Sequence, residues 1–120
     1  MQQDDARSAA VAPRIIAMRG RVDFATVEPI AEAISRELRA GHIDVVLDMQ
    51  ALESLSGGAM GSLLLQQTEA ERLGGSIKMA GVRRRVYRAL KTNGFTAVFD
   101  IHDNTEAALR AFKAKRSRVA

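Results

Sequence analysis

The chain has 120 residues, of which 47% are hydrophobic and 27% are charged, and these values are typical of one ordinary globular domain. It contains no cysteine, which excludes disulfides, cysteine nucleophiles and thiolate metal sites. The net charge of +4 comes from 18 basic and 14 acidic residues, and the four basic residues after Phe112 account for the whole excess. We therefore expect residues 113–120 to be a solubilising basic tail, and we do not expect nucleic-acid binding.

The residue pattern favours neither a metal site nor a membrane span. His42 and His102 are far apart in sequence and lack the spacing of metal ligands. No apolar run approaches the roughly 18 residues that suggest a membrane-spanning helix. The first residues also lack the basic and then apolar pattern of a signal peptide. We expect a cytoplasmic protein that does not insert into a membrane.

The first elements follow a polar, alanine-rich stretch, residues 1–13, which we expect to be a loose segment or an edge strand. Ile15–Met18 is typical of a strand, which should end at Gly20. A helix should begin near Thr26, which can cap it, and should end at Gly41 in the left-handed conformation. Its apolar stripe repeats at three- and four-residue steps and consists of Val27, Ile30, Ile34 and Leu38.

The middle of the chain repeats this alternation of strand and helix. Ile43–Leu47 is a near-continuous apolar run closed by Asp48, which suits a strand covered on both faces in a parallel sheet. A second helix is expected from about Gly57 to Leu73, and the two glycines after it should end it. The alternating residues Ser76–Met79 then predict another strand.

The last part of the chain predicts two more helices and a strand. Val82, Val86 and Leu90 form the inner side of a third helix, and residues 97–101 form a strand. A final helix should run through Phe112, with Asp103 and Glu106 resembling a capping box. Strands and helices that alternate through short connections indicate one α/β domain over residues 14–112.

The glycine cluster Gly57-Gly58-Ala59-Met60-Gly61 lies between a strand and a helix, where phosphate-binding loops are found. A Walker loop requires a lysine after its last glycine, and Ser62 stands there instead. The dinucleotide fingerprint requires a different glycine spacing and an acidic residue after the next strand. The glycines are better explained by a tight turn into the helix, so we expect no cofactor.

Catalytic side chains are equally hard to nominate. No motif links Ser54, Ser56 or Ser62 to a histidine that could act as a base. Asp23 and Asp48 follow apolar runs at the expected ends of strands, where turn or cap roles are the commoner explanation. We therefore expect no enzymatic activity.

The third helix carries five basic residues interleaved with its apolar stripe: Arg83, Arg84, Arg85, Arg88 and Lys91. We favour the solvated face of an amphipathic helix as the explanation. An acidic partner or an anionic lipid surface is the alternative.

Several short segments along the chain resemble the STAS domain family, the anti-sigma factor antagonists. Gly20-Arg21-Val22-Asp23 is similar to the family's Gly-x-Leu-Asp, and Val45–Met49 is similar to its Val-Val-Leu-Asp-Leu. Further matching segments follow in order and without gaps, at residues 74–82, 85–90, 93–95 and 98–101. The resemblance covers about residues 14–112.

The resemblance implies an α/β fold, with a small mixed sheet of four to five strands flanked by about four helices. The best-known members of the family bind a serine kinase that doubles as an anti-sigma factor. That kinase inactivates them by phosphorylating the second serine of an Asp-Ser-Ser-Gly motif at the start of the second helix, and a phosphatase restores them.

The chain departs from the family at this motif. Counting from Asp48 without a gap places the acceptor at Gly58, which has no hydroxyl. Ser56, one helical turn or less away, is the one substitute acceptor, and we favour Ser56 as the helix cap instead. The resemblance thus predicts a protein-interaction module that is not switched at the usual serine.

The expected docking site is the turn and first helical turn at Ser54–Gly61. The residues that we expect to bind a partner are Asp23, Ser56, Gly57, Gly58, Ala59 and Met60. The partner would be an anti-sigma factor or serine kinase, or another regulatory protein. An accessory subunit of a lipid-transporting ABC complex is the alternative function, and nucleotide binding at the glycines is a third. Whether the chain forms a homodimer is left open.

Overall fold

The computed structural model describes residues 12–119, and most of the expected N-terminal segment 1–13 lies outside that range. In chain order the elements are β1 (Arg14–Val22), α2 (Glu28–Arg39), β2 (Asp44–Leu55), α3 (Gly57–Arg72), β3 (Ser76–Ala80), α4 (Arg84–Thr92), the 3-10 turn η1 (Phe95–Ala97), β4 (Asp100–His102) and α5 (Thr105–Val119). The expected α/β fold, with a small sheet flanked by about four helices, is confirmed.

The four strands form one sheet in the order β1-β2-β3-β4. Neighbouring strands pair in parallel throughout, so the described part of the sheet is parallel where a mixed sheet was expected. Parallel neighbours require a crossover between them, and the helices between successive strands supply it. As a consequence, the carboxyl ends of the strands and the loops that follow them gather at one end of the sheet.

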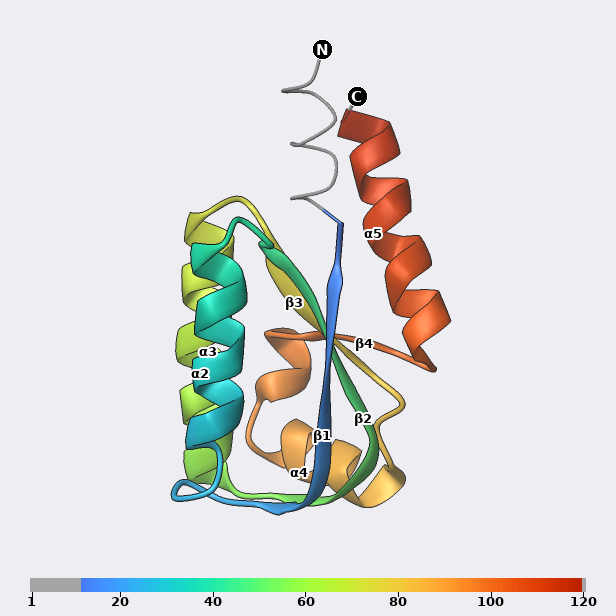
Figure 1. The fold of residues 1–120 in the computed structure, drawn as a ribbon. Coiled ribbons are helices and arrows are strands. Elements are labelled where there is room, and N and C mark those ends of the chain that lie inside the picture. Colours follow the sequence, from blue (N-terminus) through green and yellow to red (C-terminus); the bar gives the residue numbers. More distant parts are fainter. Residues whose placement is uncertain (1–11, 120) are drawn as a thin grey trace.

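Helices cover both faces of the sheet (Figure 1). α2 and α3 lie side by side on one face, α4 lies near the carboxyl ends of the strands, and α5 lies on the opposite face. The main core lies between the sheet and the first three of these helices, and a smaller cluster around Val46 and Phe112 lies beneath α5. The prediction that the apolar run of β2 is covered on both faces is confirmed, since residues 44–47 are all buried.

Lys78, on β3, is buried by the packing of α5 over the sheet. The alternating pattern of β3 left this lysine on a polar face, but the residue is only 7% exposed because α5 covers it. Its Nζ lies 4.8 Å from the centroid of the Phe112 ring and donates a hydrogen bond of 2.8 Å to Oδ2 of Asp100. The ion pair with Lys78 lowers the pKa of the Asp100 carboxyl below its usual value.

Strands β1 and β2 are both longer than the sequence pattern indicated. Gly20, where β1 was expected to end, has a φ of 65° beside a register shift, and pairing resumes beyond it. Val22 pairs with Leu55 at the end of both strands, and both side chains are buried. The two strands continue this far because both side chains belong to the main core.

The end of the chain also differs from the expectation. Residues 95–97 form a 3-10 turn, and β4 begins only at Asp100, because Phe99 turns inward and stacks on Phe95 with ring centroids 6.3 Å apart. Asn104, and not Asp103, caps α5, since its Oδ1 accepts a hydrogen bond from the Ala107 amide. α5 then continues beyond Phe112 to Val119. None of the described helices has the length and apolar character needed to cross a bilayer.

Candidate functional site

Asp23 organises the turn between β1 and α2. Its Oδ1 accepts hydrogen bonds from the amides of Ala25 and Thr26 and from the hydroxyl of Thr26. The Thr26 hydroxyl in turn accepts a hydrogen bond from the Asp23 amide. Thr26 therefore stabilises the turn and does not cap α2. The N-cap residue of α2 is Val27, and no side chain makes a capping hydrogen bond there. Turns of this kind are a common use of aspartate and fix the backbone between the two bonded residues.

These hydrogen bonds also affect the pKa of Asp23. The amide of Thr26, followed by its hydroxyl, stabilises the carboxylate and lowers the pKa of Asp23 below its ordinary value of 3.8.

We expect the Asp23 carboxyl to titrate below 3.8 in the folded protein. Because the pKa is lower in the folded than in the unfolded chain, the stabilisation is complete above the unfolded pKa and is lost as the pH falls through the folded one. A carbon-13 NMR titration of the side-chain carboxyls checks the pKa. Thermal unfolding of the protein and of Asp23→Asn, compared from about pH 7 down to about pH 2, checks the stability. A titration midpoint at or above 3.8 would contradict the prediction.

The start of α3 lies beside this turn. Ser56 is the N-cap, and its Oγ accepts a hydrogen bond of 3.2 Å from the Ala59 amide, as the cap interpretation predicted. The Ser56 amide donates to the carbonyl oxygen of Val22, the residue before the turn, at 3.0 Å. This bond joins the end of β1 to the start of α3, so the turn and the helix N-terminus form one surface.

Phe24 projects from the turn and is the residue that the sequence reasoning missed. It is 72% exposed, the largest exposed fraction among the bulky apolar side chains of the described residues. A Cβ added at Gly58 would lie 2.9 Å from the Cβ of Phe24 and 3.5 Å from its Cγ, so the phenylalanine lies directly over the glycine. One feature of the sequence could have indicated its exposure. Phe24 follows Asp23 and lies outside the apolar stripe that begins at Val27.

The expected docking residues divide into exposed and buried ones. Asp23, Gly57 and Gly58 are exposed and Ser56 is half-buried, and together with Phe24 we call them the docking surface. Ala59 and Met60, which were expected to bind a partner, are 0% and 1% exposed. Both belong to the main core. The first turn of α3 directs these two side chains into the core, so they lie beneath the docking surface and are not exposed on it.

The expected location Ser54–Gly61 needs a further correction. Ser54 and Leu55 form the end of β2 and do not belong to a turn. Only Ser56 separates the strand from α3, so the docking surface begins at the cap and obtains its second half from the β1–α2 turn.

The structure separates the two acidic residues at the expected strand ends. Asp23 follows Val22, which pairs with Leu55, whereas Asp48 pairs with Ala17 near the middle of β1. Oδ1 of Asp48 accepts a hydrogen bond of 3.1 Å from the Gln50 amide. The turn role expected of both acids is therefore found for Asp23 alone, because Asp48 lies within β2, and the two acids do not form a shared site.

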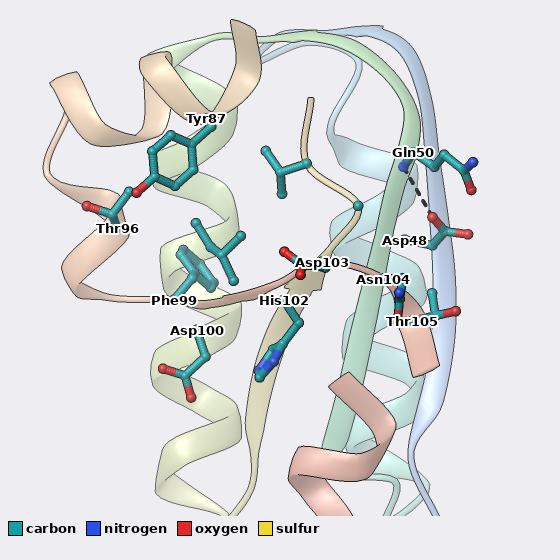
Figure 2. Close-up of a pocket in the computed structure, with 13 residues that line it drawn as sticks. Asp48, Gln50, Tyr87, Thr96, Phe99, Asp100, His102, Asp103, Asn104 and Thr105 are labelled. Atoms are coloured by element: carbon teal, nitrogen blue, oxygen red, sulfur yellow. Dashed lines mark hydrogen bonds between the residues drawn. The ribbon is translucent and has the colours of Figure 1, made fainter. Parts of the chain in front are cut away.

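A hollow of about 740 Å³ lies beyond the ends of β3 and β4 (Figure 2). Tyr87 and Thr96 lie on one side of it, and Asn104 and Thr105 at the start of α5 lie on the other. Asp48, Asp100 and Asp103 are among its lining residues, so its wall carries more negative than positive charge. An acidic wall disfavours a phosphate-bearing ligand, whose charge it would repel.

The described residues offer little for catalysis. Among the side chains of residues 12–115, no hydrogen bond joins a serine hydroxyl to a histidine, and His42 bonds instead to Arg14 and Glu37. No group of three or more histidine, aspartate or glutamate side chains within that range could hold a metal ion. What the docking surface offers is an exposed aromatic ring beside a helix N-terminus, which suits contact with a macromolecule.

Comparisons with known proteins show a family and a shared fold. The model of the STAS domain family matches residues 6–108. BtrV of Bordetella bronchiseptica, named as an anti-sigma factor antagonist, is 25% identical over 104 residues, which are 87% of this chain and 90% of BtrV. The solved structure of the antagonist SpoIIAA, in its unphosphorylated form, has a TM-score of 0.74 at 17% identity and covers 86% of this chain and 90% of that one. A sulfate transporter family protein from Wolinella succinogenes has a TM-score of 0.71 at 22% identity, with 87% of each chain covered.

Proposed function

The chain belongs to the STAS domain family, and on this premise we propose that it is a non-enzymatic, anti-sigma factor antagonist-like module. It docks on an anti-sigma-type serine kinase or a related regulatory protein in the cytoplasm and so acts in transcription regulation. The observation that carries the proposal is Phe24, 72% exposed, seated over Gly58 beside the N-terminus of α3. Large aromatic side chains at the centre of an interface contribute much of the binding free energy.

We further propose that phosphorylation at the usual serine position does not switch this module. A phosphorylated form of SpoIIAA has been solved. In this chain, counting the family motif from Asp48 without a gap places the acceptor at Gly58, which has no hydroxyl. Ser56 is the nearest hydroxyl in the α3 cap, and it already accepts the Ala59 amide. Phosphorylating Ser56 would place the phosphate at the cap and disturb this hydrogen bond, so we do not propose Ser56 as an acceptor.

The alternative, an accessory subunit of a lipid-transporting ABC complex, has weaker support. The likeness to transporter proteins is at 22% identity or less and extends only to the fold. Copurification with an ATPase subunit from the source organism, without any binding to an anti-sigma-type kinase, would favour the alternative.

Binding and phosphorylation assays with the purified anti-sigma-type kinases of the source organism test the proposal. We expect at least one kinase to bind the unmodified protein, and mass spectrometry to find no phosphate on Ser56 after incubation with ATP. Absence of binding to every such kinase would refute the docking proposal. Phosphate on Ser56 would refute the proposal that the module is not switched at the cap.

Gly58→Ser is expected to destabilise the turn and weaken kinase binding several-fold. The new Cβ would lie 2.9 Å from the Cβ of Phe24, which belongs to a turn held by three hydrogen bonds to Asp23 Oδ1, so the turn must shift. Overpacking of this kind costs about 1–3 kcal/mol. Gly61→Ser is the matched control, because a Cβ at Gly61 meets nothing within 4 Å. Thermal unfolding and titration calorimetry should show lower stability and weaker binding for Gly58→Ser than for Gly61→Ser. Equal stability and equal binding of the two variants would contradict the close contact of Phe24 with Gly58.

A further inference from the structure

The outer face of α4 is a cationic stripe made of Arg84, Arg88 and Lys91. These residues are spaced by four and three positions, so they lie on one side of the helix, and all three are exposed. The opposite side carries Val86 and Leu90, which are 1% and 0% exposed and belong to the main core. The stripe therefore points away from the domain.

The stripe has no acidic partner among the side chains that the structure describes. α4 contains no acidic residue, and none of the ion pairs within residues 12–115 involves the stripe. α2 and α3 differ in this respect, because Arg39 pairs with Glu32 and Arg72 pairs with Glu69. Like charges four residues apart destabilise a helix, so Arg84 and Arg88 repel each other in the free domain. An acidic partner would relieve that repulsion.

The stripe also adjoins the docking surface. Asn93, the C-terminal cap of α4, has its Oδ1 3.8 Å from the place that a Cβ at Gly57 would occupy. The β1–α2 turn, the start of α3 and α4 all lie at the same end of the sheet (Figure 1). Phe24, the two glycines and α4 thus follow one another across a single exposed surface.

We propose that the cationic stripe is the second half of the docking surface, and that the partner is a protein with an acidic patch beside the pocket that receives Phe24. This inference rests on the proposed docking function and adds the charge of the partner. A membrane fits less well, because a helix that lies on a bilayer must insert an apolar face. The apolar face of α4 is already buried against the sheet.

The first test compares two charge-reversal variants with equal changes in net charge. Arg88→Glu/Lys91→Glu alters the stripe, and Arg110→Glu/Lys113→Glu alters exposed positions on α5, on the other face of the sheet. Stopped-flow measurements with the kinase should show an association rate about tenfold lower for the α4 variant and changed less than about twofold for the α5 variant. The difference should shrink at about 500 mM salt. Equal slowing by both variants, or by neither, would overturn the inference.

The second test does not depend on the kinase. Poly-L-glutamate added to the nitrogen-15-labelled protein should shift the amide signals of α4, and the shifts should be lost in the α4 variant and kept in the α5 variant. Shifts retained in the α4 variant would overturn the inference. So would tighter binding, through α4, to phosphatidylserine-containing vesicles than to poly-L-glutamate. If no kinase binds the unmodified protein, the proposed function fails, and this second test still decides whether the stripe selects acidic polypeptides.

Discussion

Phe24→Ala is expected to weaken binding to the partner kinase about 30-fold, which corresponds to about 2 kcal/mol. Truncation removes the ring that stands 72% exposed above Gly58, but it leaves the Asp23 hydrogen bonds of the turn in place. The ring contributes little to the core, so the free energy of unfolding should change by less than about 0.5 kcal/mol.

Titration calorimetry with the kinase measures the loss, and thermal unfolding confirms that the fold is kept. Leu65→Ala is the matched control, because Leu65 is 70% exposed and lies further along α3, away from the docking surface. We expect the control to bind like the unmodified protein. Equal losses for the two variants would show that exposed apolar area in general, and not Phe24 in its turn, drives the association.

Gly75→Ala is expected to lower the free energy of unfolding by about 3 kcal/mol or more. A Cβ at Gly75 would lie 2.0 Å from the carbonyl oxygen of Ile43, a backbone atom that no side-chain rotation can move. The same oxygen accepts the Ser76 amide at the start of β3. Alanine would therefore force apart the segments that lead into β2 and β3, at the centre of the sheet.

Denaturant unfolding monitored by circular dichroism measures this loss. Gly61→Ala is the control of opposite sign, because Gly61 is inside α3 and its Cβ would meet nothing within 4 Å. Alanine in a helix interior is more stable than glycine by about 0.5–1 kcal/mol. If Gly75→Ala proved as stable as the unmodified protein, the close approach of these two segments would be wrong.

The absence of a hydroxyl at position 58 changes how such a module can be controlled. A phosphoserine there would add about 1.5 to 2 negative charges at neutral pH, beside the N-terminus of α3 and close to α4. Gly58 offers no attachment point for that charge, and Phe24 occupies the space above it. We therefore expect binding to be governed by the concentrations of the chain and its partner.

The sequence predicted most of the candidate site, but not how it is assembled. Ser56 as the cap of α3 and Asp23 as a turn residue follow from local hydrogen-bonding preferences, which short segments express by themselves. Ala59 and Met60 were assigned to the surface because a linear motif does not show which way each residue of a helical turn faces. Phe24 was missed because its importance depends on its contact with Gly58, and that contact joins two segments far apart in the chain.

The same division applies to the fold. The alternation of apolar strands with amphipathic helices determined an α/β domain, since hydrophobic periodicity is a local property of the chain. The ends of β1 and β2 were decided by the pairing of Val22 with Leu55, and the burial of Lys78 was decided by the packing of α5 over the sheet.

The sequence by itself thus determined the family, the order of the elements and the absence of a hydroxyl at position 58. Only the tertiary structure decided that Phe24 covers that position and that Arg84, Arg88 and Lys91 lie exposed on the outer side of α4. The physical reason is that a parallel sheet gathers loops from distant parts of the chain at the carboxyl ends of its strands, where exposed side chains combine into one surface.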